Sequence, residues 1–325
     1  NSRNFIMATY KNINGFPIQY LESDPTNPIE GQVWFNSTSK SLKGHGILGA
    51  VSTGTWSSGG SLNSTKGSGS GSAGINTAGL AVSTRATNTC ELYNGSSWTE
   101  VADRSTPTEF SGTFGSQTSA ISATGQAPGG DIANVESWDG SSWTEIADVN
   151  QARIAMGKAT SIAGNSLGLL FGGGPGGKNE TESWNGSAWT ELNNLNTGRR
   201  YLSGFGLSTS ALGFGGETAT AGSVNLVESW NGTSWTEVAE VNTGRQGGSA
   251  AGDSNTLGIY FGGGNNLLTE AWNGTAWTEV NDLASSKNEG SGSGSSVNAF
   301  VIVGGSGTAT EEWTVPVNTV TFTVS

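Results

Sequence analysis

The chain of 325 residues has little of what most enzymes use for catalysis. It contains one cysteine, Cys90, one histidine, His45, and two methionines, and only 12% of its residues are charged. A lone cysteine excludes an internal disulfide, and we expect Cys90 to be a small buried residue. A single histidine excludes a copper site built from several imidazoles and argues against Ser-His-Asp or Cys-His catalysis. We therefore expect no enzyme, no catalytic residue and no cofactor.

Long apolar runs and an excess of positive charge are also missing. No stretch approaches the length of a membrane span, so we expect none. The formal net charge is −12, from 14 Lys and Arg against 26 Asp and Glu. Without a basic stripe to neutralise phosphates, a nucleic acid is not an expected partner. No Asp-rich loop of the calcium-binding kind occurs, and we expect no metal site.

Glycine and tryptophan are abundant instead, with 52 and 12 copies. Most tryptophans lie on a recurring ten-residue segment, clearest at residues 182–191 (ESWNGSAWTE). Further copies begin at Glu91, Glu136, Glu228 and Glu270, and a truncated one begins at Glu311. The spacing of 41 to 46 residues is that of one four-stranded propeller blade.

Each copy predicts a β-hairpin. A short strand ends in an aromatic residue, Asn-Gly or Asp-Gly follows, and Trp opens the return strand. We expect a type I′ turn, with positive φ at both central residues. We assign a structural role to the tryptophans that end the third strands (Trp138, Trp184, Trp230, Trp272 and Trp313) and to those that open the fourth (Trp98, Trp143, Trp189, Trp235 and Trp277).

Two more features recur with the hairpin. Apolar strands that end in glycines precede it, as at residues 168–174 (GLLFGGG) and 258–264 (GIYFGGG). A basic residue stands ten positions after each fourth-strand Trp, a series broken only at Thr108: Lys66, Arg153, Arg199, Arg245 and Lys287. We expect these basic residues to pair, blade to blade, with the glutamates that open the third strands.

The order of these parts resembles the kelch repeat over roughly residues 56–325. The resemblance implies an all-β protein with a six-bladed kelch-like β-propeller at residues 51–325, and seven blades remain an alternative. The sixth repeat lacks a fourth strand, and residues 53–57 supply one without a third strand before it. We therefore expect 53–57 to close the ring against the last blade. The rival closing strand, residues 317–324, alternates well and would otherwise add an outer strand or make a contact outside the propeller.

Residues 1–50 are expected to be a separate N-terminal attachment segment. Residues 31–44 (GQVWFNSTSKSLKG) predict a small hairpin. It resembles the G-x-x-W-F/Y-N hairpins of tailed-phage virion proteins. Together with residues 7–16 it resembles the kelch-like structural proteins of phages of marine bacteria. The resemblance implies a virion location on the tail or particle surface, docking through Trp34 and Phe35, other virion proteins as partners, and a homo-oligomer within an assembly.

Loops that differ between blades are the expected contact surface, because they build an asymmetric face on a rigid ring. The candidate contact residues are Lys178, Asn179, Arg200, Glu217, Thr218, Asn265 and Asn266. We expect them to contact a host-surface glycan or protein. Two alternatives remain open: a soluble glycan-binding, lectin-like propeller and, third, a polysaccharide-active hydrolase, which would need an asymmetric cluster of acids at one mouth of the channel.

Overall fold

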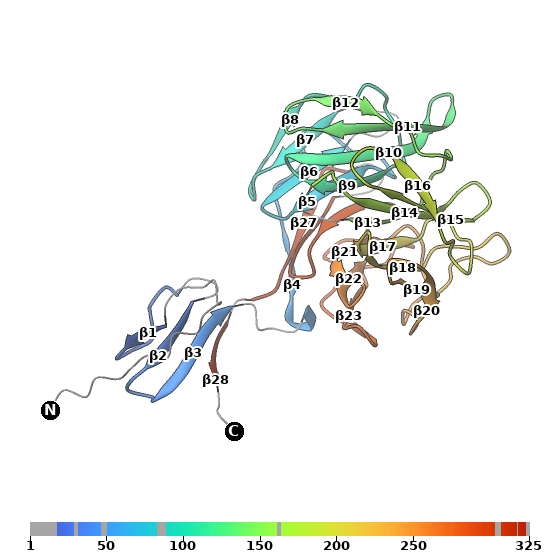
Figure 1. Cartoon of the computed structure of the whole chain (residues 1–325). Helices are drawn as coiled ribbons and strands as arrows, with labels where there is room; N and C mark the ends of the chain where they lie inside the picture. Colours follow the sequence, from blue (N-terminus) through green and yellow to red (C-terminus); the bar gives the residue numbers. More distant parts are fainter. Residues whose placement is uncertain are drawn as a thin grey trace. The chain divides into compact units, whose positions relative to one another are not determined.

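A computed structural model of the chain describes residues 18–28, 32–46, 51–82, 89–160, 164–302, 307–316 and 318–322 (Figure 1). Residues 7–17, which belong to the predicted attachment segment, lie outside this set. The described residues form β-strands and one 3₁₀ turn, η1 (Val51–Thr53). The chain divides into two compact units. We call Asn1–Ala50 with Pro316–Ser325 the terminal unit, and Val51–Val315 the repeat unit.

The terminal unit contains one sheet with the strand order β1-β2-β3-β28. Its strands are β1 (Gln19–Leu21), β2 (Val33–Asn36), β3 (Ser41–Gly46) and β28 (Asn318–Phe322). The predicted hairpin is β2 with β3, and β1 pairs with β2 in parallel. The predicted C-terminal boundary of the propeller was wrong. Strand β28 pairs antiparallel with β3, so the alternating segment completes this sheet and does not belong to the repeat unit.

The repeat unit contains six four-stranded antiparallel sheets. From the first to the fourth strand, they are β5 (Gly71–Ile75), β6 (Ala78–Val82), β7 (Cys90–Tyr93) and β8 (Trp98–Val101); β9 (Gly112–Ser116), β10 (Ser119–Ala127), β11 (Gly130–Trp138) and β12 (Trp143–Ile146); β13 (Gly157–Thr160), β14 (Gly168–Gly173), β15 (Lys178–Trp184) and β16 (Trp189–Leu192); β17 (Ser203–Leu207), β18 (Ser210–Phe214), β19 (Val227–Trp230) and β20 (Trp235–Glu237); β21 (Ser249–Ser254), β22 (Leu257–Phe261), β23 (Thr269–Trp272) and β24 (Trp277–Glu279); and β25 (Ser291–Gly294), β26 (Asn298–Ile302), β27 (Thr310–Thr314) and β4 (Thr55–Ser58). As expected from residues 53–57, β4 is the fourth strand of the last sheet, with Trp56 opposite Trp313.

The six sheets are joined in a closed, propeller-like ring. Each first strand lies next to the first strand of the following sheet, and β25 returns to β5. Just before each first strand, one residue has a φ between 52° and 70°. Its N–H donates to the carbonyl of the equivalent residue in the preceding sheet over 2.7–3.2 Å. We call these six residues the axial ring: Gly69, Phe110, Ala155, Tyr201, Gly247 and Glu289. Gly69 donates to Glu289, so the circle of hydrogen bonds has no end.

Third-strand and fourth-strand aromatic residues pair directly across each sheet. Trp184 stands opposite Trp189 with ring centroids 5.5 Å apart, and the other repeat tryptophans occupy equivalent positions. The predicted type I′ turn was wrong. The connection has four residues, and only its glycine, such as Gly186 with a φ of 96°, is left-handed. The side chain of Asn185 accepts hydrogen bonds from the two residues after that glycine, which caps the loop without a second positive φ.

The fourth-strand tryptophans also bond to the sheet before them. In three cases the indole N–H donates over 3.0 Å to a threonine that precedes a buried third-strand glutamate: Trp235 to Thr181, Trp56 to Thr269, and Trp98 to Thr310. The other three sheets carry Cys90, Val135 and Val227 at this position. In the described part of the chain, the indole N–H groups of the tryptophans that follow them, Trp143, Trp189 and Trp277, have no acceptor.

Second-strand glycines join each sheet to the next connector, which is the segment between one fourth strand and the following first strand. The N–H of Gly173 donates to the carbonyl of Arg199 over 2.8 Å, and Gly216 does the same to Arg245 over 2.9 Å. A Cβ at Gly216 would lie 2.6 Å from the carbonyl oxygen of Arg200. This close approach, together with a φ of 87°, requires glycine there.

Candidate functional site

The repeated charges form six ion pairs that are almost fully buried. Each joins a connector to a third-strand glutamate: Lys66 to Glu91 at 3.1 Å, Arg104 to Glu136 at 3.3 Å, Arg153 to Glu182, Arg199 to Glu228 at 3.0 Å, Arg245 to Glu270, and Lys287 to Glu311 at 2.8 Å. Glu228 shows the pattern in full. Its Oε1 accepts from Arg199, and its Oε2 accepts from the backbone and side-chain amides of Asn196. These acids are therefore fully engaged in structural bonds.

The expected pairing of the basic series with the glutamates is confirmed, but its geometry differs from the prediction. The two partners belong to one sheet and the connector that enters it, not to two neighbouring blades. The break at Thr108 is filled from elsewhere in the sequence. Arg104 pairs with Glu136 and donates to the Thr108 hydroxyl over 2.6 Å. Each connector is thus held by one buried cation.

Two of these glutamates have shifted pKa values. Burial alone would raise the pKa of Glu91, but the Asn63 N–H, the Ser64 hydroxyl and Lys66 outweigh it and hold that pKa below its usual value. At Glu311, burial is likewise outweighed by Lys287 and neighbouring donors, so its pKa is also lowered. Both carboxylates are stabilised in the ionised form that the ion pair needs.

The predicted contact residues lie in and beside the loops that pack on the connectors. Arg200 Nε lies 2.6 Å from Glu217 Oε1, and the Arg200 side chain is 43% exposed. Lys178 Nζ donates to Gln151 on the preceding connector over 3.1 Å.

The others take part in local loop structure. The Thr218 hydroxyl accepts from the Ala221 N–H, Asn265 has a φ of 63°, and Asn266 donates its N–H to Gly263. Asn179 donates its side-chain amide to the carbonyl of Leu195 over 3.4 Å. The structure brings only Arg200 and Glu217 together.

The two predicted docking residues differ in accessibility. Trp34 is fully buried in the terminal unit, and its indole donates to Asp24 over 2.9 Å, so its side chain offers no contact surface. Phe35 is partly buried and stacks on Tyr20 with centroids 5.2 Å apart. Tyr20 is 74% exposed. The accessible aromatic surface of this sheet is therefore Phe35 with Tyr20.

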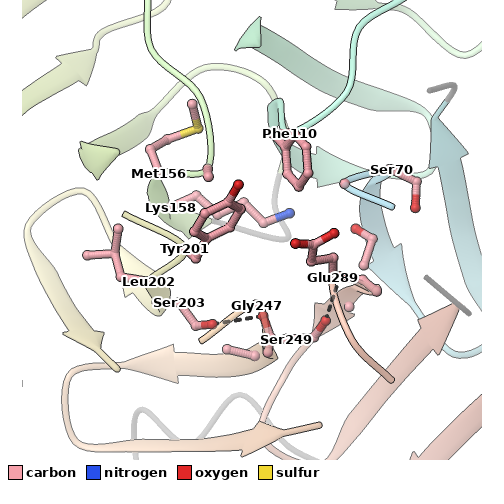
Figure 2. A pocket seen from close by; sticks show the side chains of 18 of the residues that line it. Ser70, Phe110, Met156, Lys158, Tyr201, Leu202, Ser203, Gly247, Ser249 and Glu289 are labelled. Carbon is pink, nitrogen blue, oxygen red and sulfur yellow. Dashed lines mark hydrogen bonds between the residues drawn. The ribbon is translucent and has the colours of Figure 1, made fainter. Parts of the chain in front are cut away.

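A pocket of about 100 Å³ lies inside the axial ring (Figure 2). All six ring residues line it, together with the residues that follow them in the first strands. The ring backbone is sixfold, but its side chains are not. Three are glycine or alanine, whereas Phe110, Tyr201 and Glu289 are large. Asymmetry on a symmetric scaffold marks this mouth as the candidate functional site.

Lys158 supplies the positive charge of the pocket. It comes from β13, and Figure 2 shows its amine and the Glu289 carboxylate directed toward the middle of the pocket. The ammonium donates to the backbone carbonyls of Thr113 and, over 3.2 Å, Ser72. Burial lowers the pKa of Lys158 to about 8.

The rim of the pocket is aromatic and acidic. The rings of Phe110 and Tyr201 meet edge to face with centroids 5.6 Å apart. Arg200 lies over the Tyr201 ring at 5.5 Å. Burial, followed by Glu289, raises the pKa of Tyr201, so the phenol stays protonated near neutral pH. The rim thus offers an aromatic wall, a hydroxyl donor and a carboxylate acceptor.

Sequence reasoning missed this pocket, although a signal for it exists. From the second sheet onward, the ring residue follows the basic marker position by two residues, as at Arg199 and Tyr201. The residue types there vary strongly, which contrasts with the regular repeat around them. Lys158 is likewise the one charged residue among the six equivalent first-strand positions, the others being Ser72, Thr113, Gly204, Ala250 and Gly292.

Within the described ranges, no group of three or more His, Cys, Asp or Glu side chains could hold a metal ion. In the same ranges, no helix has the length and apolar character needed to cross a membrane. Neither the models of known protein families nor the curated proteins give a match to this sequence. The geometry of the ring and its mouth therefore carries the functional argument.

Proposed function

We propose that the chain is a non-enzymatic structural protein of a tailed-phage virion, with the repeat unit as a six-bladed kelch-like propeller that binds the host surface. The observation that carries this proposal is how the acids and the asymmetry are distributed. The repeated glutamates are spent in buried ion pairs, whereas irregular loops and large side chains gather on the connectors and at the axial ring. Such a distribution favours recognition over hydrolysis.

The terminal unit fits the role of the attachment module. It brings both ends of the chain into one small sheet, separate from the repeat unit in its contacts. Its exposed aromatic surface, Phe35 with Tyr20, gives a second virion protein an apolar contact, and Ile18 nearby in the sequence is also half exposed. In this proposal the protein is tail- or fibre-associated and forms a homo-oligomer within the particle.

A soluble glycan-binding propeller remains the second candidate, favoured by the aromatic and polar mouth of the axial ring. Mass spectrometry of purified particles separates the two. We expect peptides from the chain at a constant ratio to a known virion protein, retained after washing in high salt. Absence from washed particles would refute the virion assignment and leave the soluble binder.

Host contact is tested by competition. The purified chain should reduce adsorption of intact particles to host cells in a concentration-dependent manner. A version with the 217–225 loop replaced by a short Gly-Ser linker serves as the comparison, because this loop packs against Arg200 without taking part in the axial ring. No effect of the unmodified chain on adsorption would contradict a host-binding role.

A further inference from the structure

We propose that the pocket within the axial ring binds the carboxylate of an acidic sugar, with Lys158 as the cation that holds it. This inference rests on the proposed function in taking the ligand to be a glycan, and it names the class of glycan.

Lys158 has bonding capacity left over for such a ligand. An ammonium has three N–H donors, and two are used by the carbonyls of Ser72 and Thr113. No acidic side chain of the described residues lies within 4.0 Å of its Nζ. A charge surrounded by protein without a counter-charge is unfavourable, so an anion that reaches Nζ would bind with a gain. Lys158 differs in this from the other connector and ring cations, which have acidic partners.

The pocket beside Lys158 is open because its neighbours are small. Gly204, Ala250 and Gly292 occupy the equivalent positions on the next three first strands and line the pocket without filling it. A second unsatisfied group lies in the same wall. The Ser70 hydroxyl is buried, lines the pocket and has no hydrogen-bond partner among the described residues. A carboxylate offers acceptors both to this hydroxyl and to the free N–H of Lys158.

The size of the pocket sets how much of a ligand can enter. A volume of about 100 Å³ corresponds to roughly three water molecules at about 30 Å³ each, which suits a carboxylate and the carbon that bears it. A pyranose ring is too large and must remain at the mouth. There it meets the edge-to-face pair of Phe110 and Tyr201, while Glu289 can accept hydrogen bonds from sugar hydroxyls. The mouth therefore suits a sugar that carries a carboxylate.

The charges around the site limit the number of negative groups on the ligand. Glu289 lies in the pocket itself, and Glu109 and Glu217 act on Tyr201 together with the single cation Arg200. The neighbouring first strands β5, β9, β17 and β25 contain no charged residue. One acidic group per sugar is thus accepted at Lys158, whereas further anionic groups at the rim would be repelled. A singly charged uronic acid fits better than a heavily sulfated sugar.

The test is a ligand-observed NMR titration of the full chain with glucuronate, with glucose as the neutral control of the same size. We expect glucuronate to bind at least about tenfold more tightly than glucose at pH 7, because only glucuronate forms the charge-assisted bond. Lys158→Met should abolish this difference. Lys40→Met, the same change at an exposed lysine of the terminal unit, should leave it intact. Equal binding of the two sugars, or full glucuronate binding by Lys158→Met, would overturn the proposal.

Two further measurements keep the test independent of folding. Tyr201→Ala should weaken glucuronate but not acetate, since only the sugar ring reaches the mouth. In the unmodified chain, glucuronate binding should fall as the pH rises from 7 to beyond the Lys158 pKa of about 8, because the ammonium is then lost. If Lys158→Met fails to fold, a flat pH profile alone would reject the role of Lys158. Particle mass spectrometry is unaffected by these outcomes, so the virion assignment can stand or fall separately.

Discussion

The tryptophans that cross from one sheet to the preceding one allow the free energy of a single buried hydrogen bond to be measured inside one protein. Thr181→Val replaces the hydroxyl that accepts from Trp235 by a methyl group of nearly the same shape. Leaving the indole N–H without an acceptor costs about 1–3 kcal/mol. The added methyl recovers about 0.8 kcal/mol by burial. We therefore expect the free energy of unfolding to fall by about 1–2 kcal/mol.

The reciprocal change, Val227→Thr, gives the unpaired indole of Trp277 an acceptor at the equivalent position. The new bond, worth about 1 kcal/mol, offsets the loss of apolar burial, so stability should remain within about 0.5 kcal/mol of the parent. Urea unfolding followed by circular dichroism gives both values. Adding Trp235→Phe to Thr181→Val completes a double-mutant cycle, in which we expect a coupling of about 1 kcal/mol. Zero coupling, or equal destabilisation by the two single changes, would refute the reasoning.

The other predictions concern the ion pairs, acid stability and the terminal sheet. Arg199→Met leaves a buried carboxylate unpaired and should cost about 3–5 kcal/mol in urea unfolding, whereas Arg200→Met at the exposed pair should cost less than about 1 kcal/mol; similar losses would contradict the role of burial. Glu91 and Glu311 have lowered pKa values, so their stabilisation is complete above the unfolded value of 4.5 and is lost as the pH falls through the folded values; acid titration by circular dichroism should show this loss, and constant stability from pH 5 to 2 would oppose it. Deleting residues 316–325 should speed hydrogen exchange in β3 but not in the repeat unit, and unchanged exchange in β3 would argue against its pairing with β28.

The repeat architecture could be predicted because its signals are local. The spacing, the strand-ending aromatics and the missing fourth strand all stand in the sequence, and the pairing of β4 with β27 follows from them. The partner of residues 317–324 could not be predicted in the same way. Alternation shows that a segment is a strand, but it does not show which sheet edge receives it. The four-residue turns escaped prediction because a side-chain cap replaced the second left-handed residue.

The functional mouth was harder to predict because tertiary contacts override residue preference there. Phe110, Tyr201 and Glu289 have positive φ values that these residue types seldom adopt. The ring hydrogen bonds impose that conformation, and no local pattern announces it. Arg104 illustrates the same limit, since it replaces a missing cation from a different sequence position and only the folded connector brings it to Glu136.

The axial ring separates closure from recognition. All six of its bonds are made by backbone groups, and they run in the same direction around the circle. The dipoles of these six peptide groups therefore cancel around the axis, and the field at the mouth is set by side chains alone. A side chain at a ring position can be exchanged without removing any bond that closes the circle. One scaffold of this kind can thus be adapted to different ligands by changing six residues.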